Sequence, residues 1–381
     1  MHFLWESPQW PAFSWQAERL CLPLASVRKQ QGWLLGTVQA LGFDEQLNSF
    51  ACHLSDDVNC TAAIEGERLD PESVRSSVAQ HLGLPSAGLK AAPHIVDNQV
   101  EILLDATRAA GEPLTQETLF IWHRALFPTG YSGLYKIKTG IWRTTEMQVV
   151  SGPIGRENVH FEAPPPEIVP REMQRFLKWW NTDSRLLDGL VRAAAAHLYF
   201  VTIHPFDDGN GRITRAITDR ALAEDDHFHQ RYYSLSRSIL ARRSEYYDAL
   251  QTAQRGTGDI TAWLLWFINA VSGALADSKQ SLQETLFKAR FWQLHTADPV
   301  SPREKKVVNR LLDAGKGGFK GGLSTRKYQS LTSTSRATAW RELSHLVELG
   351  LLRPIAGAGG RSTAYEIPWP DELPCRNALS Q

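Results

Sequence analysis

The sequence has few cysteines, no excess of either charge and no long uninterrupted apolar run. Its four cysteines, Cys21, Cys52, Cys60 and Cys375, show no CxxC or metal-ligand spacing, which favours reduced thiols over a disulfide framework. The formal net charge is zero, so the chain as a whole indicates neither nucleic-acid nor membrane binding. Apolar stretches such as "ITAWLLWFINAVSGAL" are short for a membrane span and contain polar residues, so they predict buried helices.

A basic segment followed by an apolar core is also missing from the beginning of the sequence, so we expect no signal peptide. These features predict a cytoplasmic protein without a membrane partner. Apolar residues make up 43% of the chain and charged residues 22%, as in ordinary globular proteins. The 381 residues are enough for about two or three domains.

Charge is unevenly distributed along the chain. Residues 301–367 contain twelve Lys or Arg and five Asp or Glu, which gives this segment a net charge of +7 and the remainder −7. The same segment reads as a helix over 301–315, a helix over 323–331, a longer helix over 332–352 and a glycine-turned hairpin. That order is typical of a winged helix-turn-helix, and we place this domain at residues 300–370.

The rest of the chain has mainly helical periodicity, and we expect a mainly α fold. Apolar residues three and four apart predict a helix over 18–41, and Asp70 followed by Pro71 predicts a capped helix start. The segment 184–203 has an almost wholly apolar second half, so it should be a central helix. β-branched residues around "SGPIG" predict one hairpin within 147–164. We expect a helical N-terminal domain over 1–90 and a second helical domain over 91–295.

The segment "HPFDDGNGRITR", residues 204–215, follows that apolar helix and begins the next one. The free N–H groups at a helix start form an anion site. Gly209 and Gly211 would let a phosphate approach the backbone closely, and Asn210 adds a side-chain donor. Arg212 and Arg215 are three residues apart, so they project from the same side of the helix and suit a polyphosphate.

Two further residues of this segment suggest chemistry on a phosphate. Asp208 would hold Mg²⁺ against phosphate oxygens, and His204 would accept a proton from an attacking hydroxyl. Taken singly, each feature has an ordinary explanation: a hydrogen-bonded core histidine, a surface turn or a solvated helix face. Their joint occurrence within twelve residues favours a phosphate site.

The segment matches the fixed positions of the Fic motif, H-P-F-x-[D/E]-G-N-G-R-x-x-R, so the chain resembles the Fic family. The resemblance implies an all-helical Fic core and transfer of AMP from Mg·ATP to a Ser, Thr or Tyr hydroxyl of a target protein. His204 would be the base and Asp208 the Mg²⁺ ligand. Residues 209–211 would hold the α-phosphate, and Arg212 and Arg215 the β- and γ-phosphates.

Two positions refine this expectation. A branch of the family that resembles Doc has Lys at the position of Gly211 and phosphorylates its target, so glycine here favours AMP transfer. The segment "TAAIEG", residues 61–66, resembles the family's inhibitory motif [S/T]-x-x-x-E-[G/N]. Glu65 would then pair with Arg215 and occupy the γ-phosphate position. Glu65 would alternatively position a water for AMP removal, and the sequence leaves the dominant direction open.

The resemblance also implies target-docking and adenine-binding residues. A hairpin flap, Val149, Val150, Ser151 and Gly152, would pair with an extended target segment by β-augmentation; an ordinary surface hairpin is the alternative. The segment "YYDALQTAQRG" resembles the family's adenine-side helix. The residues expected near the base or ribose are Tyr246, Tyr247 and Gln254. Core packing is their alternative role, and Gln254 stands where the family often has Asn.

Two other functions stay open at this level. One is a DNA-binding regulator that uses the basic winged helix, with "TSTSRATAWRELSHL" as its recognition helix. The other is an enzyme that mainly removes AMP, or a nucleotide sensor. A homodimer is implied by the resemblance alone.

Overall fold

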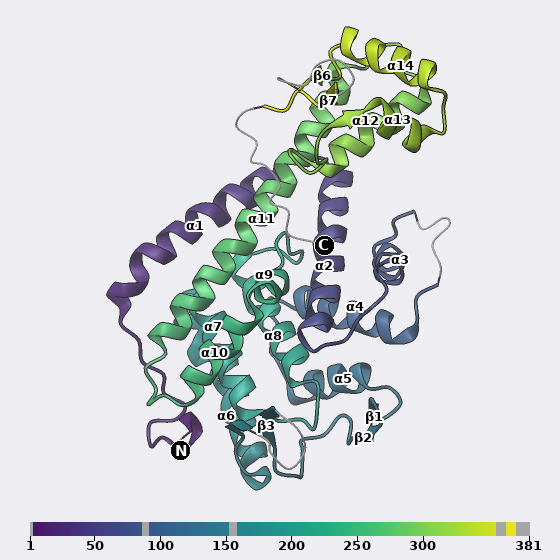
Figure 1. Cartoon of the computed structure of the whole chain (residues 1–381). Helices are drawn as coiled ribbons and strands as arrows, with labels where there is room; N and C mark the ends of the chain where they lie inside the picture. Colours follow the sequence, from purple (N-terminus) through teal and green to yellow (C-terminus); the bar gives the residue numbers. More distant parts are fainter. Residues whose placement is uncertain (1–2, 86–90, 152–157, 356–362, 371–381) are drawn as a thin grey trace. The chain divides into compact units, whose positions relative to one another are not determined.

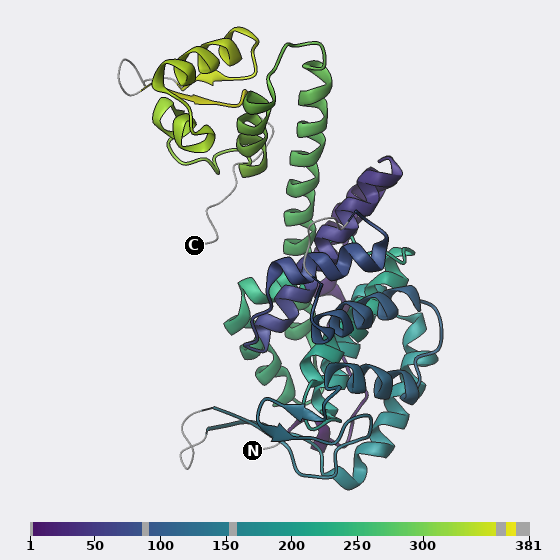
Figure 2. The same ribbon diagram turned by 90° about the vertical axis from the view of Figure 1, so that its right-hand side faces the viewer.

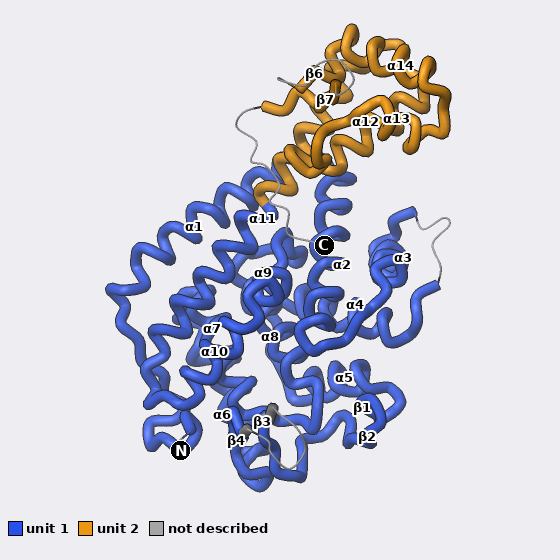
Figure 3. The backbone as a smooth tube through the Cα atoms, viewed as in Figure 1, with its two compact units in different colours: residues 1–278 blue, residues 279–381 orange. Residues whose placement is uncertain are grey.

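The chain is mainly α-helical, as predicted (Figure 1). The computed structural model describes residues 3–85, 91–151, 158–355 and 363–370. These residues belong to two compact units, unit 1 with residues 1–278 and unit 2 with residues 279–381 (Figure 3). Among the described helices, none combines the length and apolar character that a membrane span requires.

Ten α-helices lie wholly within the described part of unit 1, and an eleventh, α11, begins there. In chain order they are α1 (Ala17–Gln39), α2 (Phe43–Ile64), α3 (Pro71–Leu82), α4 (His94–Arg108), α5 (Gln116–Leu126), α6 (Val169–Asn181), α7 (Gly189–Ile203), α8 (Asn210–Asp226), α9 (Leu235–Ala241), α10 (Arg243–Gln254) and α11 (Thr261–Leu294). Short 3₁₀ turns lie at Leu4–Glu6, Pro166–Ile168 and Asp183–Leu186, and two small antiparallel sheets pair β1 (Tyr131–Ser132) with β2 (Tyr135–Lys136) and β3 (Gln148–Ser151) with β4 (Asn158–Glu162).

Helices α7 and α8 pack against each other at the centre of unit 1 (Figure 1). Every side chain of α7 from Leu190 to Ile203 is buried, which confirms the central helix expected from the sequence. The helix begins at Gly189 rather than at residue 184, because the Asp188 carboxylate accepts hydrogen bonds from the N–H groups of Leu190 and Val191. Helices α2, α4 and α5 contact α8 from other sides.

The N-terminal helices bring the end of α2 against α8. Helix α2 packs on α3, α4 and α9, and the buried Asp57 on α2 accepts a hydrogen bond from Ser234 at 2.5 Å. The expected start of α3 is confirmed, since Asp70 accepts from the N–H groups of Glu72 and Ser73 at 3.2 Å. These contacts fix the position of residues 61–67, which enter the site described below.

The predicted hairpin is present in strands β3 and β4, which project from the helical body of unit 1 (Figure 2). Gln148 pairs with Glu162, and the register shifts between Val149 and Val150. The chain start packs on this hairpin, because Phe3 makes an edge contact with Phe161 at 5.3 Å between ring centroids. Gly152, expected at the flap, lies outside the described residues.

The described residues of unit 2 contain three helices that lie wholly within the unit, and a small sheet. The helices are α12 (Pro302–Ala314), α13 (Thr325–Thr332) and α14 (Arg336–Glu348). The strands β5 (Leu323–Ser324), β7 (Ala364–Glu366) and β6 (Arg353–Pro354) lie side by side in that order and are antiparallel. The helix expected over 332–352 is shorter, since Ser335 caps α14 by accepting from Thr338 N–H at 3.2 Å. Strand β5 was not predicted, because two residues carry no periodicity.

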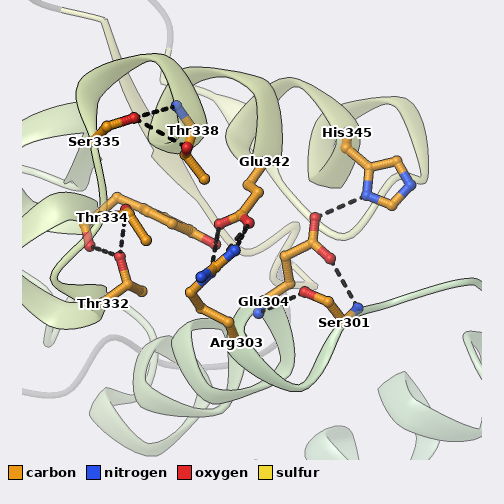
Figure 4. Close-up of polar contacts among 10 residues, drawn as sticks. Ser301, Arg303, Glu304, Thr332, Thr334, Ser335, Thr338, Glu342 and His345 are labelled. Atoms are coloured by element: carbon orange, nitrogen blue, oxygen red, sulfur yellow. Dashed lines mark hydrogen bonds and ion pairs between the residues drawn. The ribbon is translucent and has the colours of Figure 1, made fainter.

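Polar contacts tie the three helices of unit 2 together (Figure 4). Glu342 on α14 accepts from Arg303 on α12 at 3.1 Å and from the Tyr328 hydroxyl on α13 at 2.7 Å. His345 and Glu304 lie 2.8 Å apart, again between α14 and α12. The inner side of α14 is therefore committed to packing, which leaves its opposite face in solvent.

Candidate functional site

The turn between α7 and α8 is built by residues with special backbone conformations. His204 ends α7 in the left-handed region with φ 51° and Gly209 precedes α8 with φ 78°. A Cβ at Gly209 would come within 2.8 Å of the Phe127 ring, so only glycine fits there without rearrangement. The Asn210 amide closes the turn, because it accepts from Phe206 N–H at 2.9 Å and donates to Phe206 C=O at 2.8 Å. One of the two amide hydrogens of Asn210 is thus used by the turn itself.

His204 is held as a neutral base. Its Nδ1 lies 3.1 Å from the Val201 carbonyl oxygen, which can only accept, so Nδ1 carries the proton and Nε2 keeps a lone pair. Burial lowers the pKa of His204, and the nearby Arg143 charge lowers it further. At neutral pH the ring is therefore ready to accept a proton.

Arg143 supports this turn and was not expected from the sequence. Its side chain is 2% exposed, and Nε donates to the His204 carbonyl at 2.7 Å. Nη1 donates to the Thr145 carbonyl at 2.8 Å, and Nη2 donates to Pro164. Nothing in "IWRTTEM" marks such a role, because the partners are backbone carbonyls, and two of them, His204 and Pro164, are distant in sequence.

Asp208 lies at the mouth of the turn. Its Oδ2 accepts from the Ser132 hydroxyl and its Oδ1 from Gly209 N–H at 2.5 Å. Its backbone carbonyl lies 3.1 Å from Nε2 of the buried His123, whose Nδ1 accepts from Gly140 N–H at 2.9 Å. Burial lowers the pKa of His123 to about 4, so this ring is a neutral structural support. Ser132 and His123 carry no recognisable motif in the sequence.

A metal at this place would rely on one carboxylate. In the part of the chain that is described, no three His, Cys, Asp or Glu side chains gather as a metal site. One aspartate still fits Mg²⁺, which proteins commonly hold with one or two carboxylates, waters and the oxygens of a bound phosphate. Asp208 therefore fits a metal that arrives together with a nucleotide.

Arg215 is paired with the predicted inhibitory segment. Its Nη2 donates to Glu65 Oε1 at 2.6 Å, and its Nε donates to the Thr61 hydroxyl at 2.5 Å. Burial alone would lower the pKa of Arg215, but the adjacent Glu65 carboxylate raises it above its usual value. With 2% of Arg215 exposed, this charge requires an anion beside it.

Gly211 makes room for that anion. A Cβ at this position would lie 2.2 Å from Glu65 Oε1, so any side chain here would push the Glu65 carboxylate aside. The Glu65 carboxylate therefore sits over the first turn of α8, where a helix attracts negative charge. The predicted phosphate position is occupied by the chain's own carboxylate.

Arg212 is paired with a different carboxylate, which was not expected from the sequence. Its Nη1 donates to both carboxylate oxygens of Glu67, at 3.0 and 3.1 Å, and its guanidinium lies 5.0 Å from the centre of the Phe127 ring. The sequence carries one signal for this pair, which is spacing. If Glu65 faces Arg215, then Glu67 is close enough in sequence to face Arg212.

The three residues expected near adenine differ in burial. Tyr246 is 2% exposed and its hydroxyl lies 2.9 Å from His197 Nε2. Gln254 is 6% exposed and donates to the Thr202 hydroxyl at 3.4 Å. Tyr247 is 41% exposed, and its hydroxyl donates to the Ile64 carbonyl at the end of α2. Tyr246 and Gln254 are thus buried, with Tyr246 close enough to Arg215 and Glu65 for their charges to act on its hydroxyl, and Tyr247 is partly exposed; a role of the three at adenine stays a prediction.

The expected flap is anchored to α10. Arg255, just after α10, donates to the backbone carbonyls of Val159 and His160 on β4 at 3.2 and 3.0 Å. Val149 is half-exposed, and the backbones of Val150 and Ser151 pair with β4. The hairpin is therefore fixed to the same body that holds the turn.

Comparison with known proteins assigns a family to this geometry. Residues 113–222, which include His204 and both arginines, match the Fic/DOC family, and residues 3–84 match a domain of unknown function, DUF4172. Residues 113–222 therefore carry a Fic/DOC domain, in agreement with the motif in the sequence.

Relatives and solved structures agree with this assignment. The chain is 26% identical over 145 residues to a probable protein adenylyltransferase of Aquifex aeolicus, covering 38% of this chain and 39% of the relative. It is 25% identical over 200 residues to protein adenylyltransferase fic-1 of Caenorhabditis elegans, covering 51% and 36%. The chain thus spans well under half the length of these relatives. A Fic family protein from Desulfovibrio desulfuricans G20 shares the fold, with a TM-score of 0.52 at 19% identity, covering 94% of this chain and 98% of that one.

Proposed function

We propose that the chain is a protein adenylyltransferase that moves AMP from ATP to a hydroxyl of a target protein. The observation that carries this proposal is the α7–α8 turn, where a neutral His204 stands beside a helix start bearing two arginines. The similarity to protein adenylyltransferases supports the same reaction. Both arginines are held by carboxylates, so they already bind the type of charge that a polyphosphate would supply.

The residues allow the reaction to be written with its atoms balanced. The target hydroxyl oxygen attacks the α-phosphorus of ATP while its proton passes to Nε2 of His204. The bond between the α-phosphorus and the bridging oxygen breaks, and pyrophosphate leaves. The N–H groups at the start of α8 stabilise charge on the α-phosphate, and Arg212 and Arg215 bind the leaving pyrophosphate.

Asp208 would hold Mg²⁺ at the mouth of this site. When bound, the ion neutralises charge on the phosphates of the nucleotide. Ser132 donates to the same carboxylate and therefore keeps it oriented in the absence of nucleotide. The β3–β4 hairpin, fixed to α10 by Arg255, would receive an extended segment of the target through β3.

Glu65 would hold the enzyme in a resting state. Its carboxylate occupies the space over Gly211 and neutralises Arg215, so a γ-phosphate must displace it before ATP binds productively. Because α2 belongs to the same chain, this competition is present at high effective concentration.

The test uses ATP labelled on the α-phosphate, a cell lysate and purified Glu65→Gly protein, with Glu65→Gly/His204→Ala as the control. Label on protein bands that disappears in the control is the expected result. Label that comes only from γ-labelled ATP would show phosphorylation and contradict AMP transfer. Release of label from modified proteins without incorporation would favour the AMP-removing alternative.

A second function is favoured by the exposed face of α14. Arg336, Trp340 and Arg341 are exposed there, Trp340 to 64%, and residues 301–367 carry a net charge of +7. The order of α12, α13, α14 and the β6–β7 pair matches a winged helix-turn-helix, in which the third helix enters the DNA major groove. We propose that unit 2 binds duplex DNA through this face.

Fluorescence anisotropy of a labelled DNA duplex with the full chain tests this second function. Replacing Arg336 and Arg341 by alanine should weaken binding about tenfold at low salt and lower the salt slope by about 2. Arg310→Ala, on α12, is the matched control. Binding that is absent, or unchanged by the double replacement, would rule out this face as a DNA surface.

A further inference from the structure

Two carboxylates at the end of α2 face two arginines at the start of α8. Glu65 pairs with Arg215 at 2.6 Å, and Glu67 pairs with Arg212 through both of its oxygens at 3.0 and 3.1 Å. In this resting arrangement both phosphate-binding arginines of the turn are therefore occupied. Only the first of these pairs was expected from the sequence.

Gly66 is the reason that two residues so close in sequence reach the same helix. It adopts φ 83°, a left-handed conformation that ends α2 and reverses the chain. The N–H groups of Glu65 and Glu67 both donate to the Ala62 carbonyl at 3.0 Å. The backbone of residues 65–67 is thus folded tightly on the last turn of α2, and both side chains leave it toward α8.

The two ion pairs are buried to different extents, but each joins a buried arginine to a partly exposed carboxylate. The Arg212 side chain is 6% exposed and that of Arg215 2% exposed, whereas Glu67 and Glu65 are 41% and 31% exposed. Arg212 is also held from another side by the Phe127 ring, 5.0 Å from its guanidinium. The arginines are fixed parts of the site, while the carboxylates approach from its open side and can be displaced.

We propose that Glu67 is a second inhibitory carboxylate and that Glu65 and Glu67 together stand in for two phosphates of a nucleotide. This inference rests on the proposed function of the turn as a nucleotide site. Each phosphate beyond the first must then displace its own carboxylate: Glu67 from Arg212 for the β-phosphate, Glu65 from Arg215 for the γ-phosphate. A nucleoside monophosphate displaces neither, so the resting protein discriminates nucleotides by phosphate number.

Isothermal titration calorimetry with AMP, ADP and ATP in the presence of Mg²⁺ tests this proposal. The proteins are the wild type, Glu67→Gln, Glu65→Gly and the double variant. Glu101→Gln, at an exposed position on α4, is the matched control. Glu67→Gln should tighten ADP about tenfold and AMP less than twofold, because only ADP competes for Arg212. Glu65→Gly should tighten ATP more than ADP, and the double variant should bind ATP most tightly.

The outcomes separate this inference from the function on which it rests. One outcome is that Glu67→Gln leaves ADP affinity unchanged within about twofold while Glu65→Gly tightens ATP binding. This would show that Glu67 forms only a surface ion pair, and it would still support the nucleotide site. Absence of nucleotide binding in all four proteins, with circular dichroism showing them folded, would overturn both. Equal tightening of AMP and ADP by Glu67→Gln would show that Glu67 does not act through the β-phosphate.

Discussion

Two helices of this protein begin with similar pairs of arginines, and their surroundings differ. On α8, Arg212 and Arg215 are buried and paired with Glu67 and Glu65. On α14, Arg336 and Arg341 are exposed and have no salt bridge among the described residues. Water solvates the α14 charges, whereas a buried guanidinium needs an anion beside it.

The difference separates a site that must always hold an anion from a surface that is merely basic. The α8 arginines are positioned by packing and are paired with carboxylates. The α14 arginines are free to meet a polyanion without displacing anything. Four experiments test this contrast between the two helices.

The first concerns chemistry, which only the α7–α8 turn should support. In the Glu65→Gly background, His204→Ala should lower the initial rate of AMP transfer by about 10³-fold, because a positioned general base contributes on that scale. Affinity for ATP should stay within about twofold. The control Arg341→Ala should leave the rate unchanged, and a His204→Ala rate above about one tenth of its parent would argue against a base role.

The second concerns stability. Arg215→Ala should lower the free energy of unfolding by about 3 kcal/mol, since it leaves Glu65 and Thr61 without their buried partner. Arg341→Ala should change it by less than about 0.5 kcal/mol. Urea denaturation followed by circular dichroism measures both. Equal effects of the two replacements would remove the basis of the comparison.

The third concerns how each helix starts. Asn210→Ala should cost about 2 kcal/mol, because two buried backbone groups of Phe206 lose their partner. Ser335→Ala should cost about 1 kcal/mol, the usual value for an N-cap. The same denaturation experiment is used, and a larger loss for Ser335→Ala would show that the α7–α8 turn does not depend on Asn210.

The fourth experiment concerns the dependence of stability on pH. Burial, with a smaller contribution from the Arg215 charge, lowers the pKa of His197 on α7 to about 3, whereas an unfolded histidine has a pKa of about 6.5. Below that pH the unfolded chain binds more protons, so stability falls as pH falls. His197 should account for a loss of about 1 kcal/mol between pH 6.5 and 5.5.

The measurement for this fourth prediction is the slope of stability against pH in wild type and His197→Gln. The difference between the slopes isolates the histidine, because other groups contribute equally in both proteins; one of them is the buried Asp57, whose pKa burial raises well above its usual value and whose contribution has the opposite sign. Identical slopes would show that His197 does not remain neutral in the folded protein.

Much of the site could be predicted because its residues are contiguous. His204, Asp208, Gly209, Gly211, Arg212 and Arg215 lie within one segment, and a helix start imposes their relative directions. The likeness to a known motif also predicted that Glu65 would face Arg215, and the two are 2.6 Å apart. Asn210 was expected to donate to a phosphate, and in the structure its amide is hydrogen-bonded to the backbone of Phe206.

Residues that support the site from distant segments were not predicted. Arg143, His123 and Ser132 act on the turn through backbone carbonyls or a single hydroxyl contact, and such contacts leave no spacing in a sequence. Tyr246 and Gln254, expected near adenine, are buried, and their role there stays a prediction because tyrosine and glutamine on a helix suit either core packing or a binding site.

Periodicity and local backbone preferences act over a few residues, so local patterns are enough for the mainly α fold, the central apolar helix and the glycine-containing turn that follows it. Which groups lie against that turn depends on contacts between distant segments. The fold brings residues 65 and 67 to residues 215 and 212 across about 150 positions. Because the two arginines are buried, each of them needs an anionic partner, and the two carboxylates supply it.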